Sequence, residues 1–142
     1  MSYTQLVYES QASDSLVEAD VLDILKKSQT RNNQAGISGL LLFQGGRFLQ
    51  FIEGRAVEVE RLFERISQDS RHREIRTLVT MTGDRLLMPT WAMAYTSPTL
   101  DHTTASEAFT LTHRQALAIC ELLPTKIAGH FINLLAGEPG VV

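Results

Sequence analysis

The sequence predicts one α+β fold of the ferredoxin-like kind, with strands and helices in the order βαββαββ. Two segments repeat apolar residues at spacings of three and four, as amphipathic helices do, and five others have the alternation or the apolar character of strands. Their order matches a split βαβ arrangement, which places both helices on one face of the sheet. We therefore expect a five-stranded mixed sheet with two helices on one face and C-terminal helices on the other.

The first strand covers residues 4–10, TQLVYES. Side chains alternate along a strand, so Leu6 and Tyr8 share one face while Val7 and Glu9 share the other. Because Glu9 lies on the face away from the two helices, we expect it to be able to meet the C-terminal tail.

The first helix follows a capping box formed by Ser15 and Glu18. Its apolar residues recur at helical spacing and stop in a polar run at residues 32–36. Within it, Ile24, Ser28 and Asn32 lie four residues apart and form one continuous stripe on the helix surface.

The two middle strands, residues 36–43 and 45–54, are joined by a glycine-containing turn. In the second strand Gln50 shares a face with Phe48 and Ile52, whereas Leu49 and Phe51 point to the other side. Burying an amide without partners costs on the order of 1 to 3 kcal/mol. A glutamine in an apolar strand therefore indicates a functional group.

A second amphipathic helix is expected at about residues 57–68, followed by strands at 75–82 and 90–95. The last strand places Trp91 and Met93 on one face. The tail then predicts two short helices, from about 112 to 123 and from about 126 to 135, whose apolar stripes can cover the sheet face that the first two helices leave bare.

Composition bounds the class of protein. At 142 residues the chain holds one domain, residues 1–97, and an appendage, residues 98–142. The net charge of −3 argues against direct nucleic-acid binding. No apolar run reaches the roughly 18 residues of a membrane span, and no signal peptide is recognisable, so we expect a cytoplasmic protein without a membrane partner. The single Cys120 is expected to be a buried helix residue, and the dispersed histidines indicate no metal site.

The chain resembles the BLUF family of flavin-binding blue-light sensors over roughly residues 6–95, in its short stand-alone form. The blocks LVYES, SQTRNNQAGISGLLLF, GGRFLQFIEG, DSRHR and WAM carry the resemblance through their joint order and spacing. Ser38 keeps a hydroxyl where the family usually has threonine.

The resemblance implies an oxidised flavin, usually FAD with FMN also possible, between the two helices. It implies photochemical roles for Tyr8 and Gln50, with Trp91 and Met93 beside the glutamine. The residues that the resemblance assigns to cofactor binding are Tyr8, Ile24, Ser28, Arg31, Asn32, Gln50, Arg65, Asp69, Arg71 and His72.

The implied chemistry is light sensing without net catalysis, so the chain is not expected to be an enzyme. Blue light excites the flavin, Tyr8 donates an electron and a proton, and Gln50 is left rotated or tautomerised. A new hydrogen bond to a flavin carbonyl then shifts absorption slightly to the red. Short members of the family typically form homo-oligomers and pass the signal to a separate partner protein.

Ordinary structural roles remain open for most of these residues. Tyr8 can be a tyrosine at the core edge, and Asn32 can be a helix C-cap. Trp91 and Met93 can be packing residues, and Arg65, Arg71 and His72 a solvated helix end. Glu53 and Asp84 are expected to face water rather than to form an acid/base pair.

Two other classes of protein are compatible with the same fold. One is a small-ligand or RNA-binding module, which prefers exposed aromatic and basic residues on a sheet face. The other is an acyl-phosphate hydrolase, for which the sequence lacks a phosphate-binding loop.

Overall fold

The computed structural model describes residues 2–14, 16, 18–44, 46–88, 94–96 and 118–136. The elements are β1 (Tyr3–Ala12), α1 (Glu18–Ala35), β2 (Ser38–Gln44), β3 (Arg47–Arg55), α2 (Ala56–Ser67), β4 (His72–Gly83), β5 (Ala94–Thr96) and α4 (Thr125–Ala136). Their order confirms the predicted α+β class, and the ends of β1 to β4 differ by up to three residues from the predicted ones. Among the described helices, none combines the length and the apolarity needed to cross a bilayer.

The strands β4, β1, β3 and β2 form an antiparallel sheet in that order, as the split βαβ arrangement requires. The short strand β5 pairs in parallel with β2 at the edge of this sheet. The predicted strand at 90–95 overlaps β5 only at its end, because residues 89–93 lie outside the described part.

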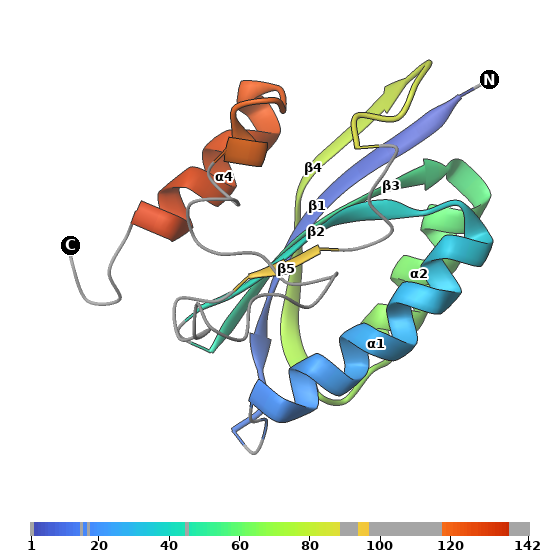
Figure 1. The fold of residues 1–142 in the computed structure, drawn as a ribbon. Coiled ribbons are helices and arrows are strands. Elements are labelled where there is room, and N and C mark those ends of the chain that lie inside the picture. The colour runs from blue at the N-terminus through green and yellow to red at the C-terminus, as the bar shows by residue number, and fades with distance from the viewer. Residues whose placement is uncertain are drawn as a thin grey trace.

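Figure 1 shows α1 and α2 together on one side of the sheet and α4 on the other. This is the predicted division between the first two helices and the tail. The predicted helix at 112–123 is described only from residue 118, where the chain is helical up to Cys120. Cys120 is buried, as expected, and its burial raises the pKa of the thiol to about 11.

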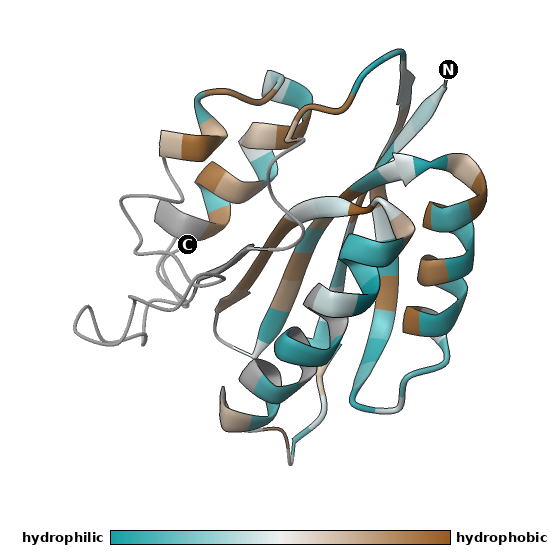
Figure 2. Cartoon of the chain, turned by 45° about the vertical axis from the view of Figure 1, so that its right-hand side comes forward, coloured by the Kyte–Doolittle hydropathy of each residue, from teal (hydrophilic) through white to brown (hydrophobic). Residues whose placement is uncertain are grey.

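Each face of the sheet has its own hydrophobic core, and alternation along the strands decides which residues join it. The core on the α2 side contains Leu6, Leu41 and Ile52 from the strands and Val59 from α2. In Figure 2 the hydrophobic residues of α2 lie on the side of the helix that faces the strands.

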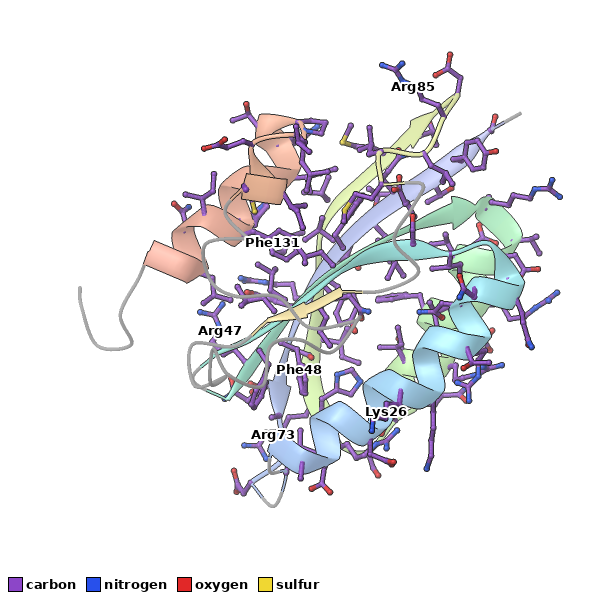
Figure 3. All side chains as sticks on the ribbon, in the orientation of Figure 1. Lys26, Arg47, Phe48, Arg73, Arg85 and Phe131 are labelled. Carbon is purple, nitrogen blue, oxygen red and sulfur yellow. The ribbon has the colours of Figure 1, made fainter. Side chains whose placement is uncertain are left out.

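The core on the α4 side contains Val7, Leu49 and Phe51 from the strands and Ile127 and Phe131 from α4. Figure 3 shows Phe131 reaching from α4 toward the sheet. The predicted face assignments in β1 and β3 are therefore confirmed. Glu9 lies on the α4 side of β1, but its ion-pair partners among the described residues are Arg47 and Arg76 of the neighbouring strands rather than tail residues.

Candidate functional site

A tyrosine and a glutamine meet at the centre of the sheet, on the side covered by α1 and α2. Tyr8 of β1 and Gln50 of β3 are direct cross-strand partners. The Tyr8 hydroxyl donates a hydrogen bond to Gln50 Oε1. Both side chains are buried. The apolar strand pattern that made Gln50 conspicuous thus brings it against a phenol.

The surroundings of Tyr8 keep its hydroxyl protonated. Burial raises the pKa of Tyr8 well above its ordinary value, and the negative charge of Asp69 raises it further. Phe63 of α2 packs edge-on against the Tyr8 ring, with 5.5 Å between ring centroids. In the resting state the proton therefore belongs to Tyr8, and the carbonyl end of the Gln50 amide accepts it as a hydrogen bond.

Asn32 lies one turn inside the C-terminus of α1. The helix ends in a Schellman motif, in which Ile37 N donates to Asn32 O at 2.9 Å and Gly36 takes a φ of 70°. Asn32 is therefore not the helix C-cap. Its side chain is buried, and among the described residues its carboxamide has no hydrogen-bond partner.

A buried amide without a partner is costly, so this geometry fits a ligand with polar groups on its edge. A flavin ring carries alternating carbonyl and N–H groups along one edge, and an amide can both donate to and accept from such an edge. Asn32, the Tyr8–Gln50 pair and the α1–α2 layer together match the chemistry of a flavin.

His72, at the start of β4, lies near Tyr8, with 6.4 Å between the ring centroids. Its Nδ1 lies 2.7 Å from Ser10 Oγ, and its Nε2 lies 2.6 Å from the Ile66 carbonyl oxygen. Since the carbonyl can only accept, Nε2 must donate and carry the proton. Both ring nitrogens are thus engaged by protein groups.

Arg71 forms a bidentate pair with Asp69 that includes an Nε–Oδ1 bond of 2.8 Å. The hydrogen bond to Asp69 raises the pKa of Arg71, and the charges of Asp23 and Asp20 on α1 add to it. The same pair holds the pKa of Asp69 below its ordinary value. The cation predicted to meet a phosphate is therefore largely balanced by nearby carboxylates.

The remaining predicted site residues either are exposed or have side chains outside the description. Arg31 of α1 and Arg65 of α2 are exposed, and among the described residues neither forms an ion pair. Ile24 and Ser28 lie in α1, but their side chains are outside the description. Trp91 and Met93 also lie outside the described residues.

Glu53 corrects one expectation from the sequence. It does not face water but is completely buried on the α4 side of β3. Its carboxylate accepts hydrogen bonds from Leu87 N at 2.7 Å, Met88 N at 2.5 Å and Ser38 Oγ at 3.1 Å. Alternation places residue 53 on the same face as Leu49 and Phe51, and this signal could have identified it.

The described residues thus form a ferredoxin-like sheet with a buried tyrosine–glutamine pair beneath two helices. The family model described as sensors of blue-light using FAD matches residues 3–94. The chain belongs to this family, BLUF, whose cofactor is FAD.

Curated relatives include the blue light- and temperature-regulated antirepressor BluF of Escherichia coli, 33% identical over 76 residues, which are 54% of this chain and 19% of the relative. A photoactivated adenylate cyclase subunit alpha-like protein of Euglena gracilis is 35% identical over 137 residues, 96% of this chain and 12% of the relative. This chain thus spans less than a fifth of the length of these relatives.

Solved structures share the fold. The dark state of the BLUF protein BlrB has a TM-score of 0.65 and 34% identity, covering 68% of this chain and 73% of BlrB. The ground state of BlsA has a TM-score of 0.66 and 28% identity, covering 96% of this chain and 89% of BlsA. The BlsA match therefore extends beyond residue 94, where the family model ends.

The RNA-binding alternative is not favoured. It requires an open sheet face with exposed aromatic side chains. Here helices cover both faces. The exposed large hydrophobic residues of the described chain are Val57, Leu122 and Ile132, none of them aromatic.

Proposed function

We propose that the chain senses blue light through a bound oxidised FAD, with Tyr8 and Gln50 as the residues that register excitation. The observation that carries this assignment is the hydrogen bond from the Tyr8 hydroxyl to Gln50 Oε1 on the face covered by α1 and α2. A phenol can release both an electron and a proton, and an amide presents a donor and an acceptor that exchange places on rotation.

The oxidised flavin, when bound, supplies the absorption of blue light and an excited state that accepts an electron. Tyr8 gives up an electron and a proton, and the proton moves first to Gln50 Oε1, because that oxygen already accepts the hydroxyl hydrogen bond. The electron and the proton then return to Tyr8, while Gln50 remains rotated or tautomerised. The lasting product is an altered hydrogen-bond network, and no bond to a substrate is made or broken.

The other residues have binding roles in this proposal. Asn32 pairs with the polar edge of the ring, since its buried amide lacks a partner among the described residues. Ile24 and Ser28 extend the same stripe of α1. Trp91 and Met93 are assigned to the surroundings of Gln50 by the family resemblance alone. Arg31, Arg65, Asp69, Arg71 and His72 line the end that holds the ribityl and phosphate groups. For Arg71 this role requires a partial exchange of Asp69 for phosphate.

The receptor as a whole is proposed to have a five-stranded sheet, with β5 extended over residues 90–95, and to form homo-oligomers. Residues 1–97 would hold the cofactor and residues 98–142 would form the extension. The signal would leave through β5, at the edge of the sheet, and through α4, on the face opposite α1 and α2, toward a separate protein.

An absorption spectrum of the purified full chain before and after blue light tests the proposal. We expect a flavin spectrum that shifts a few nanometres to the red and recovers in the dark, and chromatography of the released cofactor distinguishes FAD from FMN. Gln50→Ala should keep the flavin and lose the shift, whereas Gln34→Ala, at an exposed position in α1, should keep both. A colourless protein, or a full shift in Gln50→Ala, contradicts the assignment.

A further inference from the structure

A row of polar residues crosses β1, β3 and β2 on the face of the sheet opposite the Tyr8–Gln50 pair. Gln5 of β1 pairs with Glu53 of β3, which pairs with Ser38 of β2. These three residues form the buried polar row, with exposed fractions of 2%, 0% and 4%. The row lies three residues along β1 and β3 from Tyr8 and Gln50.

The buried polar row binds the backbone of one segment, residues 85–88, that follows β4. Glu53 accepts from Leu87 N and Met88 N, and Gln5 Nε2 lies 3.5 Å from the Arg85 carbonyl oxygen. Ser38 donates to the same carboxylate from the other side. Within the described part of the chain, the donors to Glu53 thus come from β2 and from this segment.

A buried carboxylate is too costly to retain for packing alone, because an unpaired charge in a core costs several kcal/mol. Here the cost is offset by charge-assisted hydrogen bonds to backbone N–H groups, which are directional and strong. They fix the path of the segment rather than fill space. Met88 is consequently buried in the core beneath α4, next to Cys120 and Ile127.

We propose that Glu53 is a positioning residue that ties segment 85–88 to β3, so that a change at Gln50 on the same strand alters its hold on that segment. This inference rests on the proposed function. The contact between Glu53 and segment 85–88 would be the first through which the change at Gln50 reaches the core beneath α4.

The geometry supports this coupling because β3 is hydrogen-bonded on both sides, to β1 and to β2. Such a strand moves as a unit, and a packed interior shifts between discrete arrangements rather than deforming continuously. A small displacement of β3 at Gln50 therefore reaches Glu53. The directional bonds to Leu87 N and Met88 N then weaken, because they tolerate little misalignment.

Amide hydrogen exchange of Leu87 and Met88, in the FAD-loaded full chain in the dark and under blue light, tests the proposal. We expect exchange to change about tenfold on illumination of the wild type, since a bond to a charged group contributes that much to local opening. In Glu53→Gln, exchange should already be about tenfold faster in the dark and should no longer respond to light, while the red shift persists. Glu60→Gln, at an exposed position in α2, is the charge-matched control and should behave as wild type.

Each outcome decides the inference. A normal red shift in the wild type with unchanged exchange at both amides overturns the coupling but leaves the proposed function intact. If the wild-type protein binds no flavin, or shows no red shift under blue light, the proposed function and the coupling are both overturned. If Glu53→Gln does not fold, the wild-type comparison still decides. Ser38→Ala, which removes one donor to the carboxylate, should then show a smaller acceleration in the same direction.

Discussion

The two faces of the sheet differ in how they treat buried polar side chains. On the α4 face, Gln5, Ser38 and Glu53 form hydrogen bonds with one another or with the segment after β4. On the α1–α2 face, Asn32 is equally buried, yet its carboxamide has no partner among the described residues. Among the described residues, the polar groups of the first face find their partners within the protein. The Asn32 amide on the second face is proposed to find its partner in the ligand.

This difference explains why one fold can both stay rigid and respond to light. The large core on the α4 face, built around Phe51, Ile127 and Phe131, holds the strands in place. The core on the α2 face is smaller, and Tyr8 and Gln50 lie on this face without belonging to that core. We propose that stability and photochemistry depend on opposite faces of the same strands, so that substitutions on each face should separate them.

The largest effect is expected from Tyr8→Phe, which removes the proton donor and leaves the ring. Flavin should remain bound, because the packing against Phe63 is kept, and the light-induced red shift should disappear completely. Light-minus-dark absorption spectra measure this. Tyr3→Phe makes the same change on the other face of β1 and should leave the shift unaltered. Equal shifts in the two variants would remove Tyr8 from the mechanism.

The next effect concerns stability alone. Phe131 is fully buried against the sheet, so Phe131→Ala should lower the free energy of unfolding by about 3 to 5 kcal/mol through the cavity it creates. Urea denaturation measures the loss, and the red shift of the folded fraction should persist. Ile132→Ala, at a position 39% exposed on the same helix, should cost much less. Similar losses for both would contradict the observed packing of α4.

Asn32→Leu is expected to change stability and flavin affinity in opposite directions. Removing a buried amide that has no partner among the described residues should raise the free energy of unfolding of the flavin-free protein by about 1 kcal/mol. The same change should weaken flavin binding about tenfold, because the ring loses an amide contact. Thermal unfolding and flavin titration measure the two sides. Asn33→Leu, at the exposed neighbouring position, should change neither; tighter flavin binding by Asn32→Leu would refute the role.

Local patterns in the sequence predicted the strand faces and the conspicuous Gln50, because alternation and the cost of a buried amide are local properties. The C-cap alternative for Asn32 was wrong since Gly36, with its φ of 70°, ends the helix four residues later. The sequence does contain this signal, as glycine is the residue most suited to that backbone conformation.

Glu53 was misjudged for a different reason. Its place in the alternation was readable, but its partners Leu87 and Met88 are backbone groups more than thirty residues away, at separations of 34 and 35. No local pattern identifies which loop returns to satisfy a buried carboxylate. The site roles of Trp91 and Met93 remain predictions, since both lie outside the described residues.

The smallest effect concerns Glu9, at the border of the α4 face. Partial burial acts to raise the pKa of Glu9, but hydrogen bonds and charge from Arg47 and Arg76 outweigh it and hold the pKa below the ordinary value of 4.5. A lowered folded-state pKa means that the ion pairs stabilise the protein above about pH 4.5 and that this contribution is lost as pH falls through the lowered value.

Glu9→Gln should therefore lower the free energy of unfolding at pH 7 by up to about 1 kcal/mol, because both arginines are substantially exposed and solvent screens the pairs. The difference from wild type should vanish in acid, which denaturation at several pH values measures. Asp84→Asn, at an exposed loop position, should show no comparable pH dependence. A Glu9→Gln variant that is more stable than the wild type at pH 7 would mean that the ion pairs destabilise this edge of the α4 face. The contrast between the faces would then rest on the buried polar row alone.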